Sequence, residues 1–341
     1  MSASNDNRLS YLQISTCALM SGVIGRSFTA PLDVLKVLTQ IGVLKSDRGI
    51  RYLASKIKIK DGMRGFWRGN FTSCVKLFPH SVIQFTSFNQ LKWTFSDDLG
   101  RLSAGKSIVA GTLAGINATL FTYPLDLIKT RLIVQPFAKT KSVYNGIGQA
   151  LITIIRQEGI FGLYRGFSVT LAGSIPYAAA TYTMFEFLDL VWMKPRYRLQ
   201  PIEIMIQGCL ASSIALTLTF PFDIVRKKMQ TQGNFIQQPG GIDFKNGWDC
   251  FKSIIVNHGK RGLWRGILPA ILKVAPYNGT LFLSYELCKR FSLYQNGYSD
   301  NPFTEPGRVL DQNIDRDELQ DISDYDIELD MEILDDNDKD S

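Results

Sequence analysis

The stretch Pro31-Leu32-Asp33-Val34-Leu35-Lys36 sets a proline, an acid and a base at fixed spacing, and the chain contains it three times. The other copies are Pro124-Leu125-Asp126-Leu127-Ile128-Lys129 and Pro221-Phe222-Asp223-Ile224-Val225-Arg226. An aromatic-Arg-Gly triplet follows each copy, at Trp67-Arg68-Gly69, Tyr164-Arg165-Gly166 and Trp264-Arg265-Gly266. Two motifs that recur in the same order predict three homologous repeats.

The charge distribution separates a body from a tail. We expect the repeats to occupy residues 1–96, 97–194 and 195–292, and a tail to follow over 293–341. Residues 300–341 hold 16 acidic and three basic residues, whereas the rest of the chain holds 15 acidic and 35 basic ones. The tail has too little apolar surface to offset its chain entropy, so we predict that it is disordered. The basic body indicates an anionic partner, which could be nucleic acid, anionic lipid or an anionic solute.

Six apolar segments flank the motifs. They cover residues 11–38, 71–95, 105–133, 168–193, 202–229 and 268–292. Each has about 25 residues, and about 20 suffice to cross a bilayer as a helix. None is purely apolar, which is expected of helices that line a wet cavity. Between the apolar segments of each repeat we predict a short amphipathic helix at the membrane surface. The stretch around Ile147, Leu151 and Ile154, whose apolar residues have helical spacing, is an example. Spanning segments argue against a nucleic-acid-binding protein.

Small residues precede each motif proline by 13 and 9 positions. The pairs are Ala18 and Gly22, Gly111 and Gly115, and Gly208 and Ser212. Small residues four apart let membrane helices approach closely. We therefore expect helix–helix contacts at all three pairs.

The acid and base of each motif lie three residues apart, so they share a helix face. A charge inside a spanning segment costs about 2.5–3.5 kcal/mol and usually faces a cavity or a partner. We predict that each acid meets the base of a neighbouring repeat and that the ring plugs one end of a central cavity. A purely static brace is the alternative. The ring residues are Asp33, Lys36, Asp126, Lys129, Asp223 and Arg226.

The sequence offers no signal for catalysis. The five cysteines are scattered, and no nucleophile triad, metal-ligand cluster, haem motif or phosphate-binding Gly-rich loop is visible. The N-terminus lacks the pattern of a cleavable signal peptide. We therefore expect a non-enzyme with no cofactor and no metal site.

The triplicate pattern over residues 10–292 resembles the mitochondrial carrier family (solute carrier family 25). The resemblance implies an all-α membrane protein: six tilted transmembrane helices in three pseudo-symmetric repeats, with short matrix helices around a central cavity. It implies a multi-pass, monomeric protein of the mitochondrial inner membrane, with both termini toward the intermembrane space and with membrane lipid, cardiolipin included, as a partner. The acid-Gly pair before each aromatic-Arg-Gly triplet is present as Asp61-Gly62 and Glu158-Gly159, but the third copy has His258-Gly259.

The resemblance also implies two gates. The acid–base ring would close the matrix side above a glutamine brace, which Gln40 and Gln230 match and Ile133 does not. A second ring on the opposite side would use Lys92, Glu186, Glu286 and Lys289. Asn89 replaces an acid and Asp189 a base there, so at most two bridges can form. We expect this cytoplasmic gate to be the weaker one.

A solute without three-fold symmetry must be recognised by residues that differ between repeats. The resemblance places the solute contacts at Lys76, at Gly173 with Ser174, and at Lys273, and Arg26 breaks the symmetry of the odd segments. We expect these three cations to face the cavity without acidic partners and to clamp an anionic solute that carries phosphate. The two lysines could instead bind lipid headgroups or pair with acids.

The small pair Gly173-Ser174 leaves room for a flat group such as a base. This arrangement is similar to the family branch that carries adenine nucleotides and coenzyme A, although Val34 stands where that branch has a basic residue. A carrier for carboxylates or amino acids, or a membrane regulator or scaffold that keeps the fold without transport, remains the alternative function.

Overall fold

The computed structural model describes residues 9–42, 49–96, 103–137, 144–192, 201–232, 244 and 246–297. The chain divides into two compact units, one of residues 15–286 and one that combines residues 1–14 with 287–341. The described residues form helices and turns, with no strand among them. This confirms the predicted all-helical fold. Most of the predicted acidic tail, from residue 298 onward, lies outside the described residues.

Six long helices match the six apolar segments closely. They are α1 (Tyr11–Ile41), α3 (Asn70–Phe95), α4 (Ala104–Val134), α6 (Phe167–Trp192), α7 (Pro201–Thr231) and α9 (Ile267–Gln295). Each continues through a proline, and Pro31, Pro124 and Pro221 are those of the repeated motif. Two stretches among the described residues, Gly105–Phe137 and Met205–Thr231, are long and apolar enough to cross a membrane.

Three short helices follow α1, α4 and α7 in the sequence: α2 (Gly49–Asp61), α5 (Ile147–Glu158) and α8 (Gly247–His258). A 3₁₀ turn follows each of them, namely η2 (Met63–Trp67), η4 (Ile160–Tyr164) and η6 (Lys260–Trp264), and η3 (Gln135–Phe137) extends α4. Ala150 and Ile154 of α5 are fully buried in one cluster with Leu127 and Ile128 of α4. The apolar face of the short helix thus packs on the end of the long helix that carries the motif.

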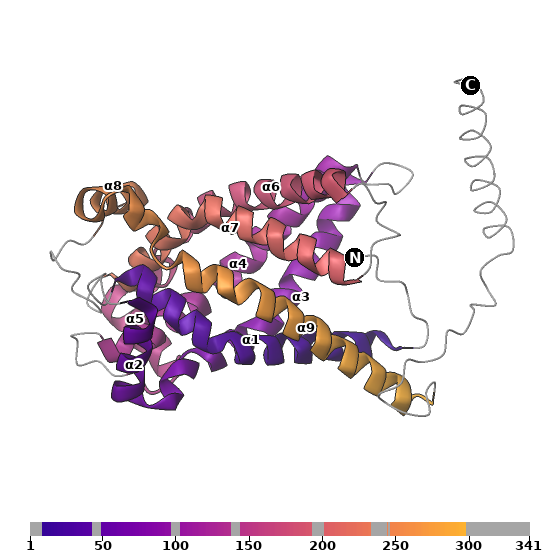
Figure 1. Ribbon diagram of the computed structural model, residues 1–341, viewed down its shortest axis with the longest axis horizontal. Helices are drawn as coiled ribbons and strands as arrows, with labels where there is room; N and C mark the ends of the chain where they lie inside the picture. The colour runs from indigo at the N-terminus through magenta and orange to yellow at the C-terminus, as the bar shows by residue number, and fades with distance from the viewer. Residues whose placement is uncertain are drawn as a thin grey trace, which may run out of the picture. The chain divides into compact units, whose positions relative to one another are not determined.

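Long helices of neighbouring repeats pair within residues 15–286. Helix α3 packs along α4, and α6 packs along α7 (Figure 1). The glycines of the aromatic-Arg-Gly triplets form the tight turns that precede α3, α6 and α9. Gly69 has φ 73°, Gly166 φ 82° and Gly266 φ 91°. A Cβ on Gly166 would lie 3.1 Å from Tyr123 Oη and 3.3 Å from the Arg226 carbonyl oxygen. The motif requires glycine because both the left-handed backbone and the close neighbours exclude a side chain.

We therefore expect Gly166→Ala to lower the free energy of unfolding by about 1–2 kcal/mol, the cost of a left-handed non-glycine residue. Gly148→Ala is the matched control, because no atom lies within 4 Å of a Cβ there and its φ is not positive. The control should leave thermal stability unchanged or raise it. Equal melting temperatures for the two variants would contradict this assignment.

The small-residue pairs behave differently in different repeats. A Cβ on Gly22 would meet Leu77 Cδ2 at 2.6 Å, and one on Gly208 would lie 3.7 Å from Phe185. Nothing lies within 4 Å of a Cβ at Gly111 or Gly115. The expectation of close packing is therefore wrong in repeat two, where these two glycines line open space.

Candidate functional site

The acid–base ring residues meet across repeats. Each base pairs with the acid of another repeat: Lys36 Nζ lies 3.1 Å from Asp223 Oδ2, Lys129 Nζ 3.3 Å from Asp33 Oδ2, and Arg226 Nη2 2.8 Å from Asp126 Oδ2. The α1, α4 and α7 helices supply all six side chains. The motif prolines lie two residues before the acids. The three pairs therefore join α1, α4 and α7.

Two of the predicted solute-binding cations also contact this ring. Lys76 Nζ lies 2.7 Å from Asp126 Oδ2, and Lys273 Nζ lies 2.7 Å from Asp33 Oδ1. The expectation that these lysines lack acidic partners is wrong. Their partners are the ring acids themselves, because a lysine side chain on α3 or α9 is long enough to reach the neighbouring motif. Arg26 donates from Nη1 to the Ser73 carbonyl oxygen at 2.9 Å.

The ring is therefore asymmetric in charge. Asp126 and Asp33 each contact two cations, whereas Asp223 forms one ion pair among the described residues, with Lys36. The position in repeat two that corresponds to the two lysines is Gly173. A Cβ there would lie 2.8 Å from Phe222 Cβ, so the glycine accommodates the phenylalanine that replaces the leucine of the other motifs.

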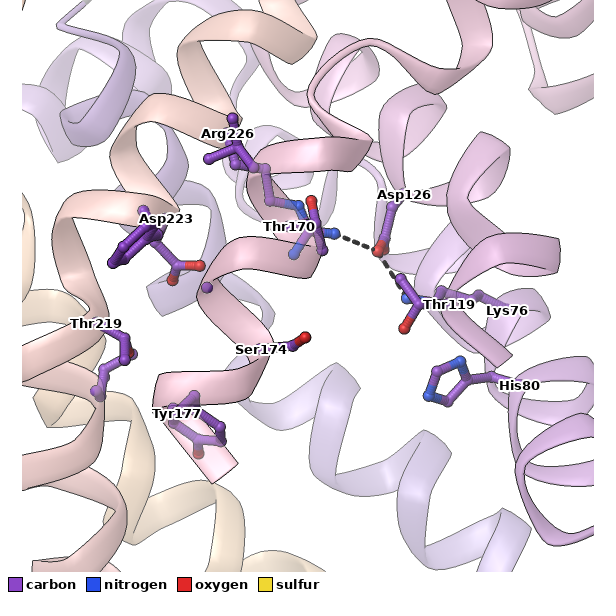
Figure 2. A pocket seen from close by; sticks show the side chains of 14 residues that line it. Lys76, His80, Thr119, Asp126, Thr170, Ser174, Tyr177, Thr219, Asp223 and Arg226 are labelled. Carbon is purple, nitrogen blue, oxygen red and sulfur yellow. Dashed lines mark hydrogen bonds and ion pairs between the residues drawn. The ribbon is translucent and has the colours of Figure 1, made fainter. Parts of the chain in front are cut away.

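A cavity of about 370 Å³ lies against this asymmetric side of the ring. Figure 2 shows Asp126 between Lys76 and Arg226, with Thr119, Ser174 and His80 along the cavity. The lining residues come from α3, α4, α6 and α7, and they are Lys76, His80, Thr119, Asp126, Val169, Thr170, Gly173, Ser174, Tyr177, Leu216, Thr219, Phe222, Asp223 and Arg226. Lys76, Gly173 and Ser174 of the predicted set therefore line one cavity. Arg26 and Lys273 are not among its lining residues.

A second cavity of about 290 Å³ extends the first. The two share five lining residues: His80, Thr119, Thr170, Ser174 and Tyr177. The extension adds Gln84, Thr112 and the open faces of Gly111 and Gly115, with no further charged residue. The combined space thus has a charged end at the ring and a neutral polar end, within the 300–1,000 Å³ typical of ligand sites.

The two glutamines predicted as braces differ in their contacts. Gln230 Oε1 accepts hydrogen bonds from Thr130 Oγ1 at 2.9 Å and from Lys227 Nζ at 3.0 Å, and Lys227 Nζ also donates to Thr130 Oγ1 at 2.9 Å. These bonds tie α4 to α7 next to the ring. Gln40 is buried, and neither polar atom of its amide has a hydrogen-bond partner among the described residues. The motif reasoning missed Lys227, which a comparison of the residue after each motif base (Val37, Thr130, Lys227) could have found.

The two glutamines should therefore respond oppositely to replacement by methionine. Gln230→Met is expected to lower the free energy of unfolding by about 1–3 kcal/mol, because it removes one acceptor from each of the buried groups of Thr130 and Lys227. Gln40→Met should be neutral or stabilising, because it removes buried amide atoms that make no hydrogen bond. Thermal unfolding of both variants checks this, and a Gln40 variant that is the less stable of the two would contradict it.

The second predicted ring is not assembled in the unit of residues 15–286. Lys92 and Glu186 are exposed, and no ion pair between described residues engages either of them. Glu286 lies in this unit, whereas Lys289 belongs to the other one. The gate role of these four residues stays a prediction.

These features, three motif copies joined in a ring beside a cavity, define a class of membrane transporter. A family model described as mitochondrial carrier protein matches residues 7–99, 100–196 and 197–296. The chain therefore belongs to the mitochondrial carrier family, whose members are transporters. This membership supports a multi-pass protein of the mitochondrial inner membrane.

The chain is similar to solute carrier family 25 member 43 of Mus musculus, with 40% identity over 326 residues and 94% of each chain covered. It is also similar to a mitochondrial adenyl nucleotide antiporter of Homo sapiens, with 32% identity over 276 residues, 80% of this chain and 56% of the relative. An adenine nucleotide transporter of Arabidopsis thaliana is 31% identical over 282 residues, which cover 81% of this chain and 69% of the relative.

Proposed function

We propose that this carrier exchanges a small anionic metabolite that carries phosphate, in the class of adenine nucleotides and coenzyme A, by alternating access. The observation that carries the proposal is the position of Lys76, which lines the cavity and at the same time holds Asp126 of the ring. The similarity to adenine nucleotide transporters supports the substrate class.

The cavity suits a solute with one charged and one flat neutral end. Lys76 and Arg226 supply cationic donors at the ring end, where a phosphate can accept charge-assisted hydrogen bonds. Gly173, Tyr177 and Phe222 also line the cavity and supply a small residue and two aromatic rings. A base could stack there, because aromatic faces bind planar groups without fixing their orientation.

Binding of an anion would compete with the ring. Lys76 and Arg226 pair with Asp126, so an entering phosphate must draw these cations from the carboxylate. A phosphate with two negative charges attracts a cation more strongly than a carboxylate with one. The solute would thereby weaken the contact between α4 and α7 and favour opening of the ring.

Exchange by the purified protein in liposomes tests the proposal. The vesicles are loaded in turn with adenine nucleotides, coenzyme A, phosphate, carboxylates or amino acids, and uptake of the labelled compound is followed. We expect homo-exchange of phosphorylated adenine compounds to be the fastest. Exchange only of carboxylates or amino acids would keep a transporter but overturn the substrate class. No exchange by protein that is folded and that binds nucleotide would favour the regulator or scaffold.

A further inference from the structure

The two acid-Gly pairs and the corresponding His258-Gly259 pair share one backbone geometry. Their glycines have φ values of 66°, 75° and 68° at Gly62, Gly159 and Gly259. The side chains of Asp61, Glu158 and His258, which precede these glycines, start from equivalent places. A second glycine follows each of them by four residues, and a Cβ built on Gly65, Gly162 or Gly262 would lie 2.8, 2.6 or 2.7 Å from the respective Cβ atom. His258 therefore occupies the position of the two acids.

Repeat two shows what the acid does at this position. Arg131 binds Glu158 with two hydrogen bonds, Nη1 to Oε1 at 2.7 Å and Nη2 to Oε2 at 2.8 Å, and Arg165 lies 3.7 Å from Oε2. Only 1% of the Arg131 side chain and 5% of the Glu158 side chain are exposed. One carboxylate thus joins α4, α5 and the turn after α5. In repeat one Asp61 pairs with Arg68 at 2.9 Å.

Repeat three keeps basic residues at the equivalent positions, and a histidine stands at the position of the acid. Lys228 corresponds to Arg131, Arg265 to Arg165 and His258 to Glu158. Lys228 is buried, with 8% exposure, and no ion pair with a described carboxylate engages Lys228 or His258. Burial raises the pKa of the neighbouring Cys250 thiol to about 12, so it remains neutral. Burial and the charges of Lys228 and Arg265 lower the pKa of His258.

We propose that Lys228, His258 and Arg265 form a binding site for a phosphate group, which takes the place that the Glu158 carboxylate fills in repeat two. The site lies where α7 meets α8 and η6 (Figure 1), apart from the residues that line the central cavities. Phosphate would join the end of α7 to α8 as Glu158 joins α4 to α5. Its source is free phosphate or the phosphate of a lipid headgroup.

Thermal unfolding of the full chain in uncharged detergent tests the site. Inorganic phosphate is titrated at constant ionic strength, because a ligand that binds the folded state raises its melting temperature. We expect a rise in the wild type that persists in Lys76→Met, which disables the central cavity. His258→Glu restores the acid of the other repeats, so it should raise the melting temperature without phosphate and abolish the phosphate-dependent rise.

Two further variants and a lipid arm complete the test. Asn257→Glu adds the same charge one residue away on α8 and should keep the rise. Lys228→Met removes the buried ammonium and should lose it, even if His258→Glu does not fold. Micelles with phosphatidic acid replace inorganic phosphate in a second series, and a rise found only there, and lost in His258→Glu, assigns the site to a lipid headgroup. No rise with either probe, or an undiminished rise in both His258→Glu and Lys228→Met, would overturn the proposal.

Discussion

Asp126→Asn is expected to lower the free energy of unfolding by about 3–5 kcal/mol, the usual effect of removing one partner from a buried charge pair. Asp126 holds two cations at short distances, Lys76 at 2.7 Å and Arg226 at 2.8 Å, whereas one of the two cations at Asp33 lies 3.3 Å away. Only 16% of its side chain is exposed, so water replaces the lost charge poorly. Asparagine keeps the shape and removes the carboxylate from both ion pairs.

Asp223→Asn is the matched control for this prediction. Asp223 belongs to the same motif, but within the described part of the chain it forms one ion pair, with Lys36 at 3.1 Å, and its side chain is 33% exposed. We therefore expect its loss of stability to be clearly smaller. Thermal and denaturant unfolding in detergent compare the two variants. Equal losses would show that the second cation contributes nothing to the ring.

Lys76→Met should weaken binding of a phosphorylated solute by about 10- to 100-fold, which corresponds to the loss of one charge-assisted hydrogen bond of about 1.5–3 kcal/mol. The stability of the protein without ligand should fall, but by less than in Asp126→Asn, because Asp126 loses one cation and keeps its pair with Arg226. The affinity is measured as the nucleotide concentration that gives half of the maximal thermal shift.

Two other lysine variants serve as a control and a comparison for Lys76→Met. Lys58→Met removes an exposed cation of α2, outside the cavity lining, and should leave nucleotide affinity unchanged. Lys273→Met removes the second lysine that contacts the ring, and it should lower stability by loosening Asp33 from its second cation. An affinity in Lys76→Met that equals that of Lys58→Met would contradict the role of Lys76.

The repeats made most of this architecture predictable. The same proline, acid and base recur at equivalent positions, so one copy interprets the other two, and the helix bounds deviate from the predicted segments by a few residues. The ring pairs follow from the same register, because residues three apart on a helix present their charges together. Family membership then supplies the class of protein.

The asymmetric part of the site was harder to predict. Nothing in the spacing indicated that Lys76 and Lys273 reach the ring acids, because contacts between helices depend on tilt and side-chain length. The cavity in repeat two likewise depends on which small residues face each other. Leu77 fills the space next to Gly22, whereas Gly115 and Ser174 line the same cavity. Lys227 was missed because only one repeat has a cation there.

The central claim is that an anionic solute and Asp126 compete for Lys76. The affinity of folded Asp126→Asn for an adenine nucleotide, compared with that of wild type and of Asp223→Asn, tests it most directly. If the claim holds, removal of the competing carboxylate frees Lys76, and Asp126→Asn binds nucleotide about 10-fold more tightly, while Asp223→Asn stays near wild type. Unchanged or weaker binding by folded Asp126→Asn would contradict it.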